Sequence, residues 1–189
     1  LNQNNIRADI YTKSALDNDN IPSIWKNFLK INNSDKFGKI ILDFFSEDLI
    51  KIYPNLFKNK NDVLSQTVGS SHKDSFNDFN LLTQMSIAIN TAVKSPSSVR
   101  NAHLDNSKKI FTSLFYMNND NNNLNGGDLI LYKWNKNYST NKKKLLYKET
   151  ASNEYYIKSK VVKYSKNKLI LFLNSIDSLH GVSPRAITD

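Results

Sequence analysis

The chain of 189 residues contains no cysteine. This absence excludes disulfide bonds, thiolate-bound zinc or iron–sulfur sites and a thiol nucleophile. Any metal ion must therefore be held by histidine, carboxylate or water. Histidine is also scarce, because only His72, His103 and His180 are present, so few histidine-containing metal sites are conceivable.

Long hydrophobic runs are missing as well. The longest, KLILFL and IILDFF, are far shorter than the roughly 20 apolar residues that a membrane-spanning helix needs. The N-terminal segment LNQNNIRADIYTK lacks the apolar stretch of a signal peptide. We therefore expect a soluble, cytoplasmic protein with no membrane partner.

Arginine is rare: the chain has three arginines against 23 lysines, within a formal net charge of +9. Recognition of base edges relies heavily on the planar arginine fork, and the accompanying 28 asparagines are typical of biased codon usage. The lysines are scattered, and their one tight cluster, at 141–144, indicates a solvated loop. We expect no nucleic-acid partner.

The length favours a single domain over 1–189, with 1–96 mainly helical. Residues 21–32 place Ile24, Phe28 and Ile31 on one helical face, whereas 37–53 fits either a helix or a strand that leads into a helix. Helical periodicity also predicts a helix over 76–95, ended by Pro96. The residues that define its stripe are Phe79, Leu82, Ser86, Ile89 and Val93.

After Pro96 the sequence changes to short β-prone runs separated by turn-rich breaks. The runs lie at 110–117, 127–134, 154–164 and 168–175. The Asn-rich break from Asn118 to Asn125 predicts a hairpin loop. We therefore predict an α+β protein with a mainly β core, an antiparallel barrel or jelly roll over 97–189, supported by N-terminal helices.

His103 and Asp105 lie two residues apart just before the first β-prone run. In an extended segment such residues point to the same side, and Leu104 points to the other. His180 follows the last run, and Gly181 beside it permits close backbone approach. Two histidines and a carboxylate would leave further coordination positions of a metal ion open, as in non-haem Fe(II) oxygenases. The same three ligands also suit zinc with water. A further alternative is that the three residues are ordinary polar residues.

Four pieces of sequence occur in an order that resembles the 2-oxoglutarate/Fe(II)-dependent oxygenase superfamily, specifically its prolyl-hydroxylase-like branch. They are HLDN at 103–106, YMN at 116–118, GGDL at 126–129, and a strand with Phe172 that leads to His180. The resemblance covers 97–189. It implies a double-stranded β-helix (jelly roll) and iron ligands at His103, Asp105 and His180.

The resemblance also implies the chemistry. It implies Fe(II), 2-oxoglutarate as co-substrate and O₂, with ascorbate as a candidate reductant, and hydroxylation of a small-molecule or peptidyl substrate with release of succinate and CO₂. Arg185 and Tyr116 match positions that hold the far carboxylate of 2-oxoglutarate. Arg185 follows His180 more closely than the family's arginine does, and Tyr116 fits equally an ordinary core tyrosine.

The remaining polar residues near the motif have two interpretations each. Arg100 meets an anionic substrate or pairs with a surface carboxylate, and Asn106 braces the ligand loop. Asn174 and Asp177 orient His180, although turn formation is the simpler interpretation of Asp177. His72 is expected to be exposed in a loop. The alternative functions are a cupin-like metal-binding β-barrel without oxidative activity, holding zinc or a sugar, and a basic interaction module.

Overall fold

The computed structural model describes residues 4–117, 125–135 and 153–187. Their contacts divide the chain into two compact units, one within 8–89 and the other formed by the described parts of 1–7 and 90–189. The boundary lies close to the change in sequence character expected after Pro96. A single domain over 1–189 stays a prediction.

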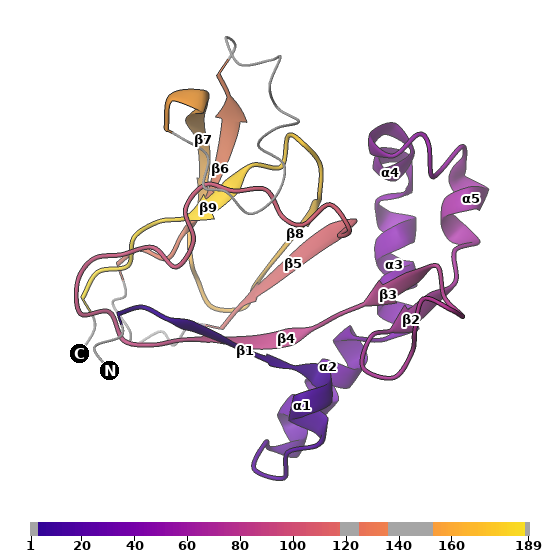
Figure 1. The fold of residues 1–189 in the computed structure, drawn as a ribbon, viewed down its shortest axis with the longest axis horizontal. Helices are drawn as coiled ribbons and strands as arrows, with labels where there is room; N and C mark the ends of the chain where they lie inside the picture. The colour runs from indigo at the N-terminus through magenta and orange to yellow at the C-terminus, as the bar shows by residue number, and fades with distance from the viewer. Residues whose placement is uncertain (1–3, 118–124, 136–152, 188–189) are drawn as a thin grey trace. The chain divides into compact units, whose positions relative to one another are not determined.

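The unit within 8–89 carries the α-helices of the described residues (Figure 1), and the other unit has a short 3-10 helix at Asn153–Tyr155. The α-helices are α1 (Thr12–Leu16), α2 (Ser23–Asn32), α3 (Asp35–Phe44), α4 (Ser46–Ile52) and α5 (Lys60–Leu64). The helix predicted over 21–32 is confirmed, and 37–53 forms two helices and no strand. The hydroxyl of Ser34 caps α3 by accepting a hydrogen bond from the Phe37 N–H at 3.1 Å.

The helix predicted over 76–95 is wrong. This segment holds β3 (Leu81–Thr83), which pairs in parallel with β2 (Val68–Ser70), and β4 (Ser86–Asn90), which pairs with β1 (Arg7–Tyr11). The expected apolar stripe does not form a buried face, because Ile89 is 51% exposed. Pairing with strands distant in sequence outweighs the local periodicity here. Residues 1–96 therefore combine helices with strands.

The second unit carries two antiparallel sheets. One pairs β5 (Phe111–Tyr116) with β8 (Lys168–Leu173), and the other has the order β7 (Tyr156–Val162), β6 (Leu129–Trp134), β9 (His180–Val182). Each of the four predicted β-prone runs contains one strand, so these predictions and the α+β class are confirmed. Within the described residues, no jelly roll or closed barrel is identified. The lysine cluster at 141–144 and nearly all of the Asn118–Asn125 loop lie outside the described part.

A small apolar cluster fixes the three-stranded sheet to the segments that carry the polar motif. Leu104 and Leu179 are buried, and the rings of Tyr132, Trp134 and Tyr156 pack against them. The indole Nε1–H of Trp134 also donates to the carbonyl of Ile176 at 2.7 Å. Residues next to all three expected metal ligands are therefore held in one core.

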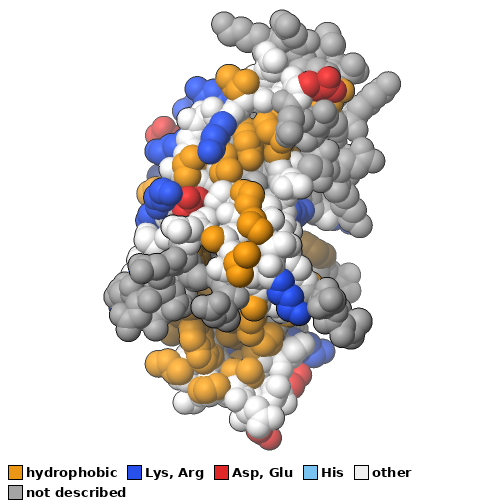
Figure 2. Space-filling view, turned by 90° about the vertical axis from the view of Figure 1, so that its left-hand side faces the viewer, with side chains coloured by type: hydrophobic (Ala, Val, Ile, Leu, Met, Phe, Trp, Pro, Cys, Tyr) orange, Lys and Arg blue, Asp and Glu red, His pale blue; other side chains and the backbone are white. Residues whose placement is uncertain are grey.

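Several large apolar side chains remain on the surface, and Figure 2 shows apolar groups on the face that it draws. In α2, Ile24 and Ile31 are 72% and 67% exposed, whereas Leu29 is fully buried. The helix is thus correctly predicted, but the face it buries is not the one that contains Ile24 and Ile31. No described helix has the length and hydropathy to span a membrane.

Candidate metal centre

The two histidines are brought together by backbone pairing. His180 begins β9, which is bonded to β6 on one side, where Leu131 faces His180. On the other side the His103 N–H donates to the His180 carbonyl at 2.8 Å, and the His180 N–H donates to the His103 carbonyl at 3.1 Å. Paired residues of neighbouring strands project from the same face of a sheet. Both imidazoles therefore lie on one face.

Gly181 makes this close pairing feasible. A Cβ atom at this position would lie 3.0 Å from the backbone N of Ala102 and 3.0 Å from the carbonyl C of Asn101. The segment before His103 thus packs directly against the backbone of β9. This agrees with the expectation that Gly181 allows close approach.

The alternation predicted for the motif is present. His103 and Asp105 are 6% and 5% exposed, and Leu104 between them packs with Leu179 in the apolar cluster. Extended backbone sends successive side chains to opposite sides. One side of this segment therefore joins the core while the other presents polar groups.

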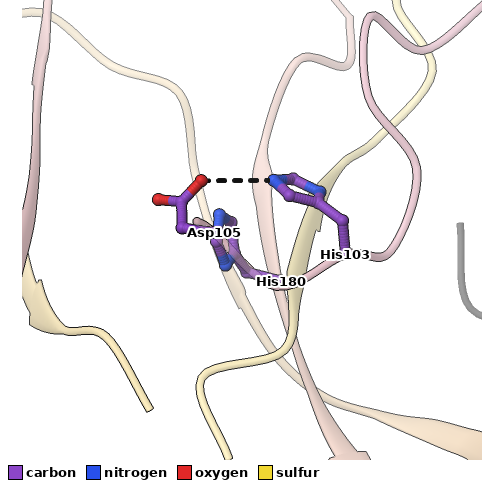
Figure 3. Close-up of side chains that lie close together, drawn as sticks. All are labelled: His103, Asp105 and His180. Atoms are coloured by element: carbon purple, nitrogen blue, oxygen red, sulfur yellow. Dashed lines mark ion pairs between the residues drawn. The ribbon is translucent and has the colours of Figure 1, made fainter. Parts of the chain in front are cut away.

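His103, Asp105 and His180 converge, and all three are buried (Figure 3). One ligand atom from each lies within 4.8 Å of the other two. Nε2 of His103 is 3.9 Å from Oδ1 of Asp105, and the two imidazole centroids are 4.3 Å apart. The three residues could hold a metal ion between them.

Each imidazole is oriented by the backbone two residues before it. Nδ1 of His103 lies 2.6 Å from the carbonyl oxygen of Asn101, and Nδ1 of His180 lies 2.8 Å from that of Ser178. A carbonyl oxygen only accepts, so Nδ1 must carry the proton and donate it. Nε2 of each neutral ring is then the atom with a lone pair for a metal, a typical arrangement of metal-binding histidine.

Burial keeps both imidazoles neutral at neutral pH. It lowers the pKa of His103 to about 4, and it also lowers the pKa of His180. The backbone hydrogen bonds from Nδ1 act in the opposite direction but are outweighed. Because metal ions bind the deprotonated ring nitrogen, no proton needs to be displaced from Nε2 near pH 7.

Asp105 is held as a carboxylate. Burial by itself would raise its pKa, but the hydrogen bond from Thr112 and the charge of Lys109 outweigh burial, so the pKa lies below its ordinary value. The Thr112 hydroxyl donates to Oδ2 at 2.6 Å. Oδ1, the oxygen nearest His103, is thus the one placed toward a metal.

Asn174 ties together the two loops that carry the ligands. It is 4% exposed, and its Nδ2 donates to the carbonyls of Asn106 at 2.8 Å and Lys109 at 3.0 Å. Its Oδ1 accepts from the Ser178 hydroxyl at 3.2 Å, and the Ser178 carbonyl accepts from His180. Asn174 thus reaches His180 only through Ser178, and its role in orienting His180 stays a prediction.

The other two turn residues act locally. The Asn106 side chain accepts from the Lys108 N–H at 3.0 Å, which braces the turn after Asp105 as expected. The Asp177 N–H donates to the Ser175 hydroxyl at 3.1 Å, in keeping with the turn-forming interpretation. On the other side of the centre, the ring of Phe172 lies 4.8 Å from that of His180.

Two cations flank the carboxylate. Nη1 of Arg100 lies 3.6 Å from Oδ1 of Asp105, and Nζ of Lys109 lies 3.7 Å from Oδ2. Arg100 thus pairs with a carboxylate, but with the buried Asp105 and not with one on the surface. The sequence analysis did not identify Lys109 and Thr112 as partners of Asp105. The only sequence signal for Lys109 is its spacing of four from Asp105, and the only one for Thr112 is that it is a polar residue in an apolar run.

Arg185 and Tyr116 make their described contacts elsewhere. Nη1 of Arg185 donates to Oδ1 of Asn5 at 2.9 Å and to the Thr91 carbonyl at 3.2 Å. The Tyr116 ring packs on Tyr164 with centroids 4.7 Å apart, and burial raises its pKa to about 12. Their role in binding 2-oxoglutarate stays a prediction.

His72 belongs to the unit within 8–89. It was expected to be exposed, but it is partly buried, and its Nδ1 lies 3.1 Å from Nδ2 of the buried Asn33. Burial lowers its pKa. A structural contact within 8–89 accounts for this histidine.

Two neutral imidazoles and one carboxylate are ligands that suit first-row transition metals such as iron, cobalt and zinc. Three protein ligands leave further coordination positions for water or a small molecule. Comparison of the chain with protein-family models, with curated proteins and with solved structures finds no match. The functional argument therefore rests on the geometry of the centre.

Proposed function

We propose that the chain is an Fe(II)- and 2-oxoglutarate-dependent oxygenase that hydroxylates a small-molecule or peptidyl substrate and releases succinate and CO₂. In this proposal 97–189 forms a double-stranded β-helix core. The supporting observation is the convergence of His103, Asp105 and His180 with both Nε2 atoms available. The ligand set and its order along the chain are those that the sequence resemblance implies.

Each residue of the candidate metal centre would have a separate role. Nε2 of His103, Nε2 of His180 and Oδ1 of Asp105 would hold the ion, which together with 2-oxoglutarate and O₂ supplies the oxidising chemistry when bound. The carbonyls of Asn101 and Ser178 keep the imidazoles in the binding tautomer. Thr112 holds the second carboxylate oxygen.

The co-substrate would need a cation for its far carboxylate. Arg185 and Tyr116 are proposed for this role on the sequence resemblance. The Arg185 guanidinium donates to Asn5 and Thr91. Arg185 would therefore have to exchange these partners or share them.

Anaerobic titration of the Fe(II)-loaded protein with 2-oxoglutarate tests the proposal. We expect a weak visible charge-transfer band, which reports chelation of ferrous iron by the keto acid. The band should be lost in His180→Ala, and Arg185→Ala should require more 2-oxoglutarate to reach the same absorbance. An iron-loaded protein that shows no band at millimolar 2-oxoglutarate would contradict the proposal.

A second candidate is a cupin-like β-barrel that binds a metal without oxidative activity. The observation that favours it is the engagement of Arg185 with Asn5 and Thr91, which leaves the proposed anchor occupied. The same ligands also suit zinc. Zinc in the purified protein, together with no effect of 2-oxoglutarate on Fe(II) affinity or absorbance, would support this candidate.

A further inference from the structure

The candidate metal centre carries an excess of positive charge. Within 4 Å of the single carboxylate of Asp105 lie the cationic groups of Arg100 and Lys109. One negative group thus faces two positive ones. A divalent ion would bring the excess to three charges, in a centre whose ligands are buried.

Neither cation is fully committed to Asp105. The distances of 3.6 Å from Arg100 and 3.7 Å from Lys109 exceed those of charge-assisted hydrogen bonds. Oδ2 already accepts the Thr112 hydroxyl at 2.6 Å. The side chains of Arg100 and Lys109 are 49% and 48% exposed, so each can reach a ligand that approaches from solvent.

Both cations extend from fixed backbone. The Arg100 carbonyl accepts from the Val182 N–H of β9 at 2.9 Å. The Lys109 carbonyl accepts from Nδ2 of the buried Asn174 at 3.0 Å. The backbone of Arg100 and of Lys109 is therefore hydrogen-bonded to the same segments that carry the metal ligands.

Arg100 also lies close to the carboxylate oxygen of Asp105 that would hold a metal ion. Its Nη1 is 3.6 Å from Oδ1 of Asp105, the oxygen that lies 3.9 Å from Nε2 of His103. An ion bound to that oxygen would repel the guanidinium, because like charges at this separation are unfavourable. Arg100 would then turn away from Asp105 unless an anion bound beside it.

We propose that Arg100 and Lys109 form an anion-binding pair, and that Arg100 exchanges its contact with Asp105 for the carboxylate of a ligand when the metal ion binds. The inference rests on the proposed function because it requires an ion in the centre. It narrows the ligand to a carboxylate-bearing molecule. That carboxylate belongs either to the co-substrate or to the substrate.

In the variant Arg100→Gln, we expect the affinity for Co(II) and the affinity for 2-oxoglutarate to change in opposite directions. Arg100→Gln removes a charge that opposes the ion, so Co(II) should bind the variant several-fold more tightly. The same change removes a donor to the anion, so 2-oxoglutarate should bind the Co(II)-loaded variant roughly ten-fold more weakly. A residue with a merely structural role would not move the two affinities in opposite directions.

Matched variants complete the test. Lys109→Gln should also weaken 2-oxoglutarate binding roughly ten-fold, whereas Lys108→Gln, which makes the same charge change at the neighbouring exposed position, should leave it unchanged. Both affinities are measured by calorimetry at fixed ionic strength. Arg185→Ala provides the comparison with the anchor proposed from sequence.

The two sources of the carboxylate give different results. Loss of 2-oxoglutarate affinity in Arg100→Gln and Lys109→Gln assigns the pair to the co-substrate. If that affinity is unchanged, the Co(II) protein saturated with 2-oxoglutarate is titrated with glutarate, a dicarboxylate without the keto group. Glutarate binding that is weakened in both variants assigns the pair to the substrate.

The outcomes that would overturn the proposal are distinct from failure of the metal centre. Wild-type protein that binds Co(II), with both anion affinities unchanged in Arg100→Gln and Lys109→Gln, overturns the anion-binding pair and leaves the centre intact. Weaker Co(II) binding by Arg100→Gln overturns the exchange at Asp105. Absence of Co(II) binding by the wild-type protein would instead refute the proposed function, and this inference with it.

Discussion

At the scale of single residues, sequence analysis identified the three candidate metal ligands but missed two partners of Asp105. His103 and Asp105 share a side because extended backbone alternates, and the scarcity of histidine left few candidates for a third ligand. Thr112 and Lys109 meet Asp105 only because the turn after it folds back. No local pattern encodes that contact.

Thr112 determines which oxygen of Asp105 faces the metal. We expect Thr112→Val to raise the pKa of Asp105, because the hydrogen bond to Oδ2 is lost, and to weaken Co(II) binding roughly ten-fold. Calorimetric titration measures the affinity. Ser113→Ala, at the next and exposed position of β5, is the control, and equal affinities for the two variants would contradict this role.

At the scale of elements, local signals predicted the strands of the second unit well. The runs of β-branched and aromatic residues at 110–117 and 168–175 became β5 and β8. The helix prediction for 76–95 was wrong because the apolar spacing of this segment fits a helix. The strands β1 and β2, with which its strands pair, lie outside the segment. Periodicity describes a segment alone, and sheet pairing depends on the rest of the chain.

The turn at 106–109 is held by one buried side chain. Asn174→Ala should lower the free energy of unfolding by about 2 kcal/mol, since two carbonyls lose their donor inside the protein. Urea unfolding of the metal-free protein measures this loss. Asn106→Ala removes only an exposed acceptor and should cost less than about 1 kcal/mol. A larger effect of Asn106→Ala than of Asn174→Ala would argue against this brace.

At the scale of the whole molecule, the pH dependence of stability should reflect the buried histidines. The unfolded chain binds a proton at His103 near pH 6.5, whereas burial lowers the pKa in the folded chain to about 4. Between these values the unfolded state holds more protons, so stability rises with pH. Stability is therefore fully present above pH 6.5 and is lost as pH falls toward 4.

For His103 alone the difference amounts to roughly 3 kcal/mol. Urea unfolding of the metal-free protein at several pH values between 7.5 and 4.5 should show this decline, and His103→Gln should flatten it. Co(II) should raise stability by about the same amount at pH 7 and at pH 6 and leave the decline between them unchanged, because the ion binds only the folded chain and displaces no proton from His103 there. Stability that stays constant or increases as pH falls from 6.5 would contradict the burial of neutral imidazoles.

The measurement that tests the central claim most directly is the stoichiometry of anaerobic Fe(II) binding to the wild-type chain, to His180→Ala and to His72→Ala. The account predicts one ion per chain for the wild type and for His72→Ala, because His72 lies outside the triad and contacts Asn33. It predicts no stoichiometric iron for His180→Ala, in which one of three ligands is lost. Stoichiometric iron retained by His180→Ala, or no binding by the wild type, would contradict the assignment of His103, Asp105 and His180 as a metal centre.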